Sequence, residues 1–184
     1  MSRRTMLGLI VPAALIAAYL GVTSLIRAHV DDLIQHAVNR PLPEFQLADL
    51  GGRSWSKQDL LGKRAVLHFF RSHCHSCDVE APAIRTLEQQ AGQDTVWLHV
   101  MTDVVLDVDQ ATTDATIARK QFQRPVLMAD DAFMELFHKS DWSQVTPITY
   151  IVDPAGVVRF GLRGLQTEAA VTAALAAVSV TGGG

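Results

Sequence analysis

The chain has 184 residues, of which 48% are hydrophobic and 19% are charged, and its formal net charge is −3. This length suits one ordinary domain, and the composition excludes a disordered or collagen-like chain. The first 30 residues carry three arginines and no acid, so the remaining 13 basic and 19 acidic residues give the rest a net charge of −6. An acidic body has no electrostatic reason to bind DNA or RNA, so we expect no nucleic-acid partner.

The first predicted element is an uncharged segment from Leu7 to Ile26, in which 15 of 20 residues are apolar. A helix of this length spans ~30 Å, the thickness of the hydrocarbon core of a bilayer. Arg3 and Arg4 precede it, which favours a cytoplasmic N-terminus and export of the rest of the chain. We therefore expect residues 1–28 to be a single-pass anchor in the inner (cytoplasmic) membrane, with the body in the periplasm or an equivalent extracytoplasmic space.

A cleaved signal peptide is the rival interpretation of this segment, and a buried core helix is the third. A signal peptide should have an apolar core of ~7–15 residues that ends in a small-x-small cleavage site. The core here is longer, and Val22-Thr23-Ser24 is a poor cleavage site. A core helix would need a polar face, which this segment lacks. The anchor and the signal peptide both place the body outside the cytoplasm.

Apolar residues at helical spacing continue after the anchor, until Arg40-Pro41-Leu42-Pro43 ends any helix. We interpret residues 29–41 as a juxtamembrane linker and residues 42–180 as the folded domain. The last residues, 181–184, are predicted to be a disordered tail.

The body alternates apolar strands with helices, which predicts an α/β sandwich. Ala65–Phe70 is a continuous apolar run, typical of a strand buried on both faces. A turn at Asp153-Pro154-Ala155-Gly156 predicts a hairpin near the end. In chain order we expect strands at 45–50, 54–56, 65–70, 95–101, 125–128, 148–152 and 157–162, and helices at 74–90, 112–121, 131–137 and 167–178.

The two cysteines, Cys74 and Cys77, form a C-x-x-C pair between a buried strand and a helix. A loop this short hardly constrains the unfolded chain, so the pair is no structural framework. The helix N-terminus stabilises a thiolate and should lower the pKa of Cys74 from ~8.5 toward ~3.5–7.5. We expect Cys74 to be an exposed nucleophile and Cys77 to resolve the mixed disulfide, so that the pair is a redox-active disulfide.

Further short motifs surround this pair in a specific order. They are Pro43-Glu-Phe45, Gly62-Lys63 and the strand 65–70 before it, and Glu80-Ala81-Pro82 and Val145 through Gly156 after it. In this order the motifs resemble the TlpA-like membrane-anchored thioredoxins, a family that includes the cytochrome c maturation thioredoxins. The resemblance implies a thioredoxin-like fold, with a central mixed sheet flanked by helices and an N-terminal β-hairpin extension. It also implies thiol–disulfide exchange with protein substrates, no cofactor, and recycling by a membrane electron donor or acceptor.

The resemblance also implies roles for residues around the pair. Pro147 is expected to follow a cis peptide bond and, with Thr146, to bind the substrate peptide beside Cys74. Glu80 lies three residues after Cys77 and so faces roughly the same side of the helix. Similar proteins use this glutamate to tune or deprotonate the buried cysteine. The expected catalytic residues are therefore the two cysteines, Glu80 and Pro147.

The active-site loop departs from the pattern of the family, which usually has W-C-x-x-C with proline at the second x. Here His73 precedes Cys74, the inner pair is His75-Ser76, and Arg71 replaces a small residue. Protonated His73 and His75, together with Arg71, would tune the pKa of Cys74 by favouring its thiolate. Stabilising the reduced form makes a disulfide more oxidising, against the reductive role usual in the family. The direction of electron flow stays open, with reduction as the slight preference.

A copper or other metal carrier is the alternative function, because His73, Cys74, His75 and Cys77 include ligands that suit zinc or copper. Copper-delivery proteins of this fold generally use a wider cysteine spacing and a distal histidine, and neither has a clear counterpart here. We therefore expect no metal site. A peroxiredoxin would need P-x-x-x-T-x-x-C, and leucine and arginine fill the proline and threonine positions.

Other notable residues are interpreted as structural. His68 is predicted to be a core histidine with satisfied hydrogen bonds. Asp103, Asp107 and Asp109 are interpreted as a solvated loop surface, since a calcium loop would have the usual glycine. On the helix after the cysteines, an apolar side is expected from Val79, Ala83, Ile84 and Leu87.

Overall fold

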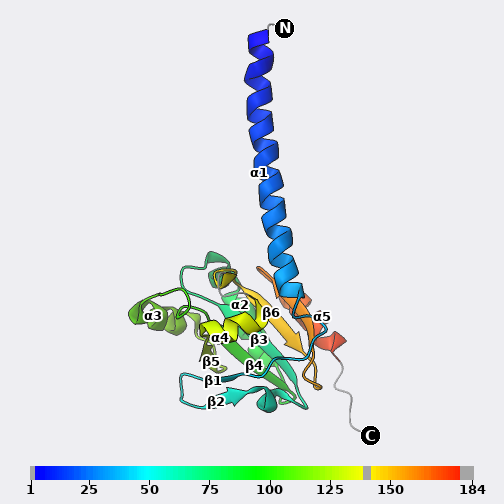
Figure 1. Ribbon diagram of the computed structural model, residues 1–184. Coiled ribbons are helices and arrows are strands. Elements are labelled where there is room, and N and C mark those ends of the chain that lie inside the picture. The colour runs from blue at the N-terminus through cyan, green and yellow to red at the C-terminus, as the bar shows by residue number, and fades with distance from the viewer. Residues whose placement is uncertain (1–2, 139–141, 179–184) are drawn as a thin grey trace. The chain divides into compact units, whose positions relative to one another are not determined.

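The computed structural model describes residues 3–138 and 142–178 (Figure 1). Contacts divide the chain into two compact units, Met1–Asp32 and Leu33–Gly184. The elements in chain order are α1 (Arg3–Gln35), β1 (Gln46–Ala48), β2 (Ser54–Ser56), the 3-10 helix η1 (Lys57–Leu60), β3 (Arg64–Phe70), α2 (His75–Gln90), β4 (Thr95–Met101), α3 (Gln110–Lys120), β5 (Val126–Met128), α4 (Asp131–Phe137), β6 (Ile148–Val152), β7 (Val158–Arg163) and α5 (Glu168–Ala177). The predicted tail, residues 181–184, lies outside the described ranges.

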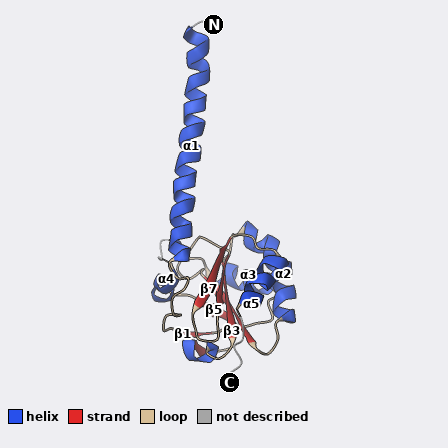
Figure 2. Cartoon of the chain, turned by 90° about the vertical axis from the view of Figure 1, so that its right-hand side faces the viewer, coloured by secondary structure: helices blue, strands red, loops and turns tan. Residues whose placement is uncertain are grey.

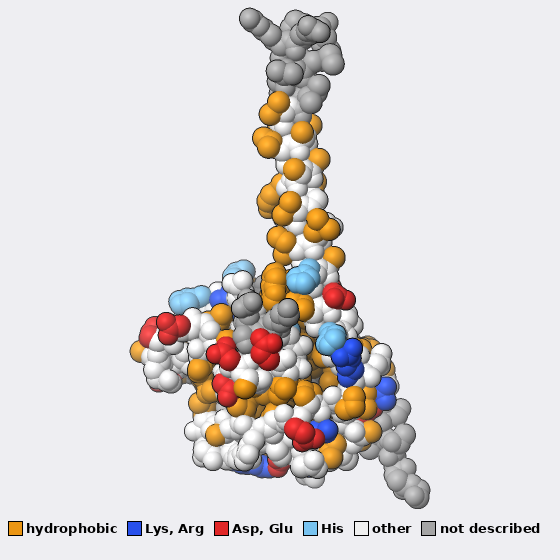
Figure 3. Space-filling view, in the orientation of Figure 1, with side chains coloured by type: hydrophobic (Ala, Val, Ile, Leu, Met, Phe, Trp, Pro, Cys, Tyr) orange, Lys and Arg blue, Asp and Glu red, His pale blue; other side chains and the backbone are white. Residues whose placement is uncertain are grey.

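The first unit is the greater part of helix α1. The stretch Val11–Gln35 is long and apolar enough to cross a membrane, and none of its apolar window is buried in the protein. Exposed apolar side chains are spread along the described length of this helix (Figure 3). The predicted N-terminal apolar helix is therefore confirmed, with the length that a membrane span requires.

The second unit is built on a five-stranded mixed sheet in the order β5-β4-β3-β6-β7. The strands β3, β4 and β5 pair in parallel, whereas β6 is antiparallel to both β3 and β7. The strands β1 and β2 form a separate antiparallel hairpin. These features confirm the predicted α/β fold, with its central mixed sheet and N-terminal hairpin extension.

Helices cover both faces of this sheet: α2, α3 and α5 lie on one side and α4 on the other (Figure 2). Side chains of β3 alternate between the two faces. Val66 packs with Ile84 of α2 and Val171 of α5, whereas Phe69 contacts the ring of Phe133 in α4. The prediction that this strand is buried on both faces is confirmed.

The first residues of the second unit pack on the edge strand β7. Ile34 and Ala37 are buried, and the Gln35 side chain donates a hydrogen bond of 3.2 Å to the carbonyl of Gly161. A Cβ atom at position 161 would lie only 2.8 Å from the Ile34 side chain and 3.2 Å from the Tyr150 ring. This close approach requires glycine.

Helix α2 buries part of its predicted apolar side together with two carboxylates. Val79 is 51% exposed, whereas Glu80 and Glu88 are buried together with Ile84 and Leu87. The placement of Val79 is therefore wrong. Ile84 and Leu87 lie on the buried side as the apolar periodicity predicts, and Glu80 and Glu88, which bond to histidines of the sheet, occupy the rest of that side.

Candidate redox site

The cysteine pair lies at the N-terminus of α2, where the preceding loop returns from β3. Cys74 and Cys77 form a disulfide, with a Sγ–Sγ distance of 2.01 Å and a Cα–Cα distance of 5.2 Å. Cys74 is the N-cap residue of the helix, as its sequence position predicts. Its exposure is 5% and that of Cys77 is 1%, because both pack with Phe70, Met101 and Val126. The prediction of an exposed Cys74 is therefore wrong.

Two hydrogen-bond donors point at the Cys74 sulfur. The backbone N–H of Cys77 donates to it over 3.1 Å, and the Thr146 hydroxyl donates over 3.4 Å. The Thr146 carbonyl oxygen lies 3.7 Å from the same sulfur. The Thr146–Pro147 peptide bond is cis, which confirms the predicted conformation. These contacts place Thr146 beside Cys74 across the fold, and both donors would stabilise negative charge on the sulfur.

Arg71 joins the cysteine loop to the loop that contains Pro147. Its guanidinium donates to the carbonyl of Gln144 over 3.1 Å, and to those of Ser72 and His73 over 2.9 and 3.2 Å. A guanidinium offers five N–H donors in a fixed plane, which suits several carbonyls at once. The sequence predicts Arg71 only as a charge that tunes Cys74, and the structure shows that it also fixes the geometry between the two loops.

The two histidines of the loop are exposed on either side of Cys74. His73 has a left-handed backbone, with φ of 53°, and His75 is the first residue of α2. Their predicted effect on Cys74 stays a prediction. In the part of the chain that the structure describes, no group of three or more His, Cys, Asp or Glu side chains is arranged to hold a metal ion.

Asp103 is buried beneath the cysteine loop, and its assignment to a solvated surface is wrong. Its carboxylate accepts hydrogen bonds from the Ser72 N–H (2.8 Å), the Ser72 hydroxyl (2.6 Å) and the Thr113 hydroxyl (2.8 Å). The carboxylate stays buried because these donors replace water. Asp107 is exposed, as predicted, and Asp109 caps helix α3.

Behind Cys77, four buried side chains form a continuous chain of hydrogen bonds. Glu80 Oε1 lies 2.8 Å from His68 Nε2, His68 Nδ1 lies 3.0 Å from His99 Nδ1, and His99 Nε2 lies 2.8 Å from Glu88 Oε2. The predicted core histidine, His68, is confirmed as buried and hydrogen-bonded. Sequence reasoning missed His99 and Glu88. The available signal was the histidine at an equivalent position of each buried strand, since His68 and His99 are register partners.

Burial and hydrogen bonding set the protonation states of His99 and Glu88, at the end of this row of hydrogen bonds. Burial lowers the pKa of His99 to about 4, despite its bond to Glu88. Burial raises the pKa of Glu88, but the hydrogen bonds from His99 and from the backbone N–H groups of Gln123 and Arg124 outweigh it, so the net shift is downward. Glu88 is therefore ionised and His99 is neutral.

A buried lysine lies close to the same region. The Lys120 ammonium donates to Asp78 over 2.7 Å, and its side chain is 2% exposed. Burial lowers the pKa of Lys120, while electrostatic attraction to Asp78 and Glu80 acts in the opposite direction. The hydrogen bond from Lys120 lowers the pKa of Asp78. Asp78 directly follows Cys77, so this ion pair is part of the electrostatic environment of the site.

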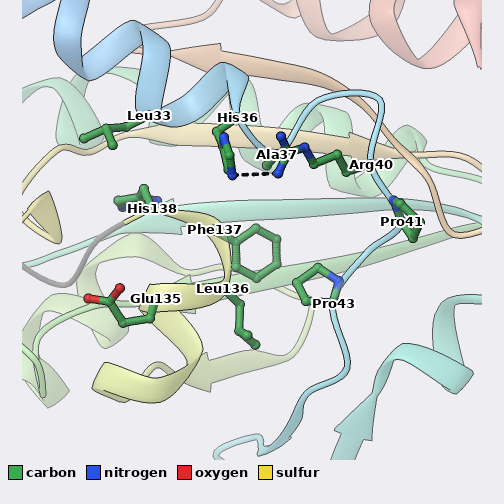
Figure 4. A pocket seen from close by; sticks show the side chains of 10 residues that line it. All are labelled: Leu33, His36, Ala37, Arg40, Pro41, Pro43, Glu135, Leu136, Phe137 and His138. Atoms are coloured by element: carbon green, nitrogen blue, oxygen red, sulfur yellow. Dashed lines mark hydrogen bonds between the residues drawn. The ribbon is translucent and has the colours of Figure 1, made fainter.

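A cavity of about 380 Å³ lies elsewhere in the second unit, between residues 33–43 and 135–138 (Figure 4). Within it the Arg40 guanidinium donates to His36 Nε2 over 2.7 Å. Neither cysteine lines this cavity, so it is separate from the redox site.

Taken together, the fold and the site define a class of protein. A mixed sheet that carries a C-x-x-C disulfide at a helix N-terminus, faced by a cis-proline loop, characterises the thioredoxin-like thiol–disulfide oxidoreductases. A family model described as "AhpC/TSA family" matches residues 38–160. Because this match covers more than half of the sequence, the chain belongs to the AhpC/TSA family. The peroxidatic pattern does not accompany the match, since Leu67 and Arg71 occupy its proline and threonine positions.

Individual relatives agree with this class. The chain is 30% identical over 122 residues to the thioredoxin-like protein YneN of Bacillus subtilis, covering 64% of this chain and 66% of YneN. It is 24% identical over 131 residues to the thiol-disulfide oxidoreductase ResA of Bacillus thuringiensis, covering 71% of this chain and 72% of ResA. The chain thus spans just under two thirds of YneN and somewhat more of ResA.

A solved structure shows the same fold. MTB DsbF (Mycobacterium tuberculosis), solved in mixed oxidised and reduced forms, superimposes with a TM-score of 0.59 at 25% identity. The match covers 73% of this chain and 95% of DsbF. The resemblance indicated by the sequence motifs is confirmed for the thioredoxin-like family and its fold.

Proposed function

We propose that the protein is a membrane-tethered thiol–disulfide oxidoreductase that exchanges disulfides with protein substrates outside the cytoplasm. The observation that carries the proposal is the surroundings of the Cys74 sulfur. It lies at a helix N-terminus between the Cys77 N–H and the Thr146 hydroxyl, next to cis Pro147. These groups stabilise a thiolate on Cys74 when the disulfide is reduced, and a thiolate is the nucleophile in disulfide exchange.

The exchange proceeds in two steps in the reductive direction. The Cys74 thiolate attacks one sulfur of a substrate disulfide, and the other substrate sulfur leaves as a thiolate. Cys77 then loses its proton and attacks the Cys74 sulfur, which releases the second substrate thiolate and forms the Cys74–Cys77 disulfide. Two electrons pass from the cysteine pair to the substrate, and the two substrate thiolates take up protons.

The neighbouring residues have distinct roles in this scheme. Thr146 and Pro147 present an extended backbone to the substrate, where main-chain pairing gives affinity with little sequence preference. Glu80 accepts the proton of Cys77, its neighbour on the buried face of the helix. Arg71 holds the two loops in register, while the exposed His73 and His75 add positive charge near Cys74 when protonated.

The N-terminal helix supports the proposed location. The stretch Val11–Gln35 can span a bilayer, and Arg3 and Arg4 precede it, which favours a cytoplasmic N-terminus. Residues 1–28 then form the anchor, 29–41 the linker and 42–180 the exported domain. Disulfide exchange suits such an oxidising compartment. A membrane electron donor would return the pair to its reduced state.

Reduction is the direction that we propose, on the resemblance to the TlpA-like thioredoxins. A redox titration of the full-length chain in detergent, against glutathione or dithiothreitol buffers, tests both parts of the proposal. A reduction potential near ~−270 mV supports a reductase, and one near ~−120 mV assigns the protein as an oxidant instead. If Cys74 and Cys77 form no disulfide at any potential, the proposed function is wrong.

A further inference from the structure

The four residues Glu80, His68, His99 and Glu88 form a row of hydrogen bonds between helix α2 and the face of the sheet that it covers. The row begins and ends at α2. Glu80 and Glu88 belong to α2, His68 to β3 and His99 to β4. All four residues are at most 1% exposed. The Phe122 ring stacks on His99 at a centroid distance of 3.9 Å, and Phe70 stacks on His68 at 5.9 Å. The chain is therefore sealed from water along its length.

The number of hydrogen-bonded contacts fixes how many protons these four side chains share. Each of the three contacts joins two acceptor-capable atoms, so each needs one proton to be a hydrogen bond. The outer carboxylate oxygens already accept from the backbone, Glu88 Oε1 from Gln123 over 2.7 Å and Glu80 Oε2 from Gln166 over 3.3 Å. The chain therefore holds three protons. Two neutral histidines and two carboxylates supply only two, so one further proton is bound.

The position of this further proton follows from the groups already described. Glu88 is ionised and His99 is neutral, so His99 Nε2–H donates to Glu88 and the proton between the two rings is on His68 Nδ1. The third proton then lies between His68 Nε2 and Glu80 Oε1. This contact is the end of the chain nearest Cys77, which is three residues before Glu80 on α2.

Charged groups on the neighbouring elements flank both ends of the chain. Lys120, at the end of α3, interacts electrostatically with Glu80 and is paired with Asp78 of α2. At the other end, Arg124 acts electrostatically on His99 and donates to the carbonyls of Glu88 and Ala91. Each carboxylate thus has a cation nearby, which allows negative charge to reside at either end.

We propose that Glu80, His68, His99 and Glu88 form a buried proton relay that serves Cys77. The relay rests on the proposed function, because it acts in the step where Cys77 attacks the Cys74 sulfur. The role goes beyond that of Glu80 alone. His68, His99 and Glu88 act through Glu80, so they are positioning residues rather than catalytic ones.

The relay takes up one proton in this step. The Cys77 thiol gives its proton to Glu80 Oε2, which is held only by the long bond from Gln166. The proton between the rings then moves from His68 to His99, and the His99 Nε2 proton moves to Glu88. The chain changes from three protons and a charge of −1 to four protons and no charge. The electron pair of Cys77 forms the new bond to Cys74, and reduction of the pair reverses each transfer.

The substitution Glu88→Gln tests the relay while its three contacts can stay hydrogen-bonded, although the 3.3 Å bond from the Arg124 N–H to Oε2 is lost. The introduced side-chain amide can donate to His99 Nε2, His99 can then donate from Nδ1 to His68, and His68 can donate to Glu80. In this arrangement one proton lies between the two imidazole rings and one lies between His68 and Glu80. His68 is then neutral, and the neighbouring Glu80 carries a full negative charge. Negative charge near a thiol disfavours the thiolate.

The experiment measures ionisation of Cys77 in the full-length chain, in detergent, with Cys74→Ser leaving Cys77 as the single thiol. Ultraviolet absorbance of the thiolate is followed against pH. We expect E88Q to raise the midpoint by ~1 pH unit, about a tenfold smaller thiolate fraction at a given pH below the midpoint. The matched control is His138→Gln, which changes a buried histidine outside the relay and leaves the midpoint unchanged. Equal midpoints for E88Q and its parent would overturn the relay.

A second measurement on the unsubstituted protein keeps the test independent of how the variants fold. With ¹⁵N-labelled histidine, a shared proton between His68 Nδ1 and His99 Nδ1 gives a coupling between these two nuclei across the hydrogen bond. Absence of this coupling in the folded, oxidised protein overturns the relay. Neither result touches the proposed function, which the redox titration of Cys74 and Cys77 tests by itself.

Discussion

The two faces of the central sheet are built from the same strands and differ in chemistry. Toward α4, Phe69 packs against the rings of Phe133, Phe137 and Tyr150. Toward α2, the neighbouring residue on β3, His68, enters a chain of histidines and carboxylates. Successive residues of one strand thus serve packing on one face and proton chemistry on the other. The aromatic face is held by ring packing, and the polar face is the one that borders the cysteines.

Removing the central ring of the aromatic face should have the largest effect. Phe69→Ala leaves a cavity among the surrounding rings, and we expect it to lower the free energy of unfolding by about 3–5 kcal/mol. Denaturant titration measures this loss. The reduction potential of the cysteine pair should not change in the fraction that stays folded, and a shifted potential would contradict the separation of the two faces.

Acid should weaken both faces through one histidine on each. Burial lowers the pKa of His99 and of His138 to about 4, well below the ordinary value of about 6.5. Both bind protons more weakly in the folded state, so the stability they contribute is complete above pH ~6.5 and is lost as pH falls toward 4. Each contributes about 3 kcal/mol over this window. Unfolding free energies measured between pH 7 and 4 should fall accordingly.

A substitution of His138 separates its contribution to the acid sensitivity from that of His99. His138 lies against Phe69, with ring centroids 5.8 Å apart, and its ring nitrogens have no hydrogen-bond partner among the described residues. His138→Phe should therefore remove the part of the pH dependence that comes from His138 and leave that from His99. An unchanged slope of stability against pH would show that His138 titrates normally.

Asp103 offers a smaller test on the polar face, below the cysteine loop. Asp103→Ala leaves the Ser72 N–H and the Thr113 hydroxyl without their acceptor, while the Ser72 hydroxyl keeps Thr116 Oγ1 at 2.8 Å, and we expect a loss of about 2–3 kcal/mol. Asp103→Asn keeps an acceptor oxygen and should lose less. Thermal or denaturant unfolding measures both. Equal losses would indicate that the charge, rather than the hydrogen bonds, anchors the loop.

The smallest expected effect concerns the donor from the opposite loop. Thr146→Val keeps the shape of the side chain but removes the hydroxyl that donates to Cys74 Sγ. A neutral hydrogen bond contributes about 1 kcal/mol, so alkylation of Cys74 near neutral pH should slow by about 3–10-fold. Thr146→Ser keeps the hydroxyl and serves as the control. A Ser variant as slow as the Val variant would contradict the role of the hydroxyl.

The sequence predicts those features that depend on local patterns. The buried run of β3, the hairpins and the helix start at Cys74 follow from short motifs, whereas the cis bond before Pro147 is predicted only through the resemblance to the TlpA-like thioredoxins. The contacts of Asp103 and Glu88 escape prediction because their partners come from other elements, and no local pattern records them. The placement of Val79 on α2 is misjudged for the same reason. The resemblance implies that Thr146 lies beside Cys74, but no local pattern shows that Cys74 is also buried against Phe70, Met101 and Val126.

The tight packing at Gly161 has a consequence for anyone who wishes to graft this chain's leading segment onto another domain. Residues 33–41 pack on β7 only where position 161 offers no Cβ, since that atom would lie 2.8 Å from Ile34. In a recipient domain with a larger residue at the matching edge-strand position, the Cβ would meet Ile34, and the segment or the strand would have to shift. Transfer of this segment therefore depends on glycine, rather than alanine or a larger residue, at the matching position.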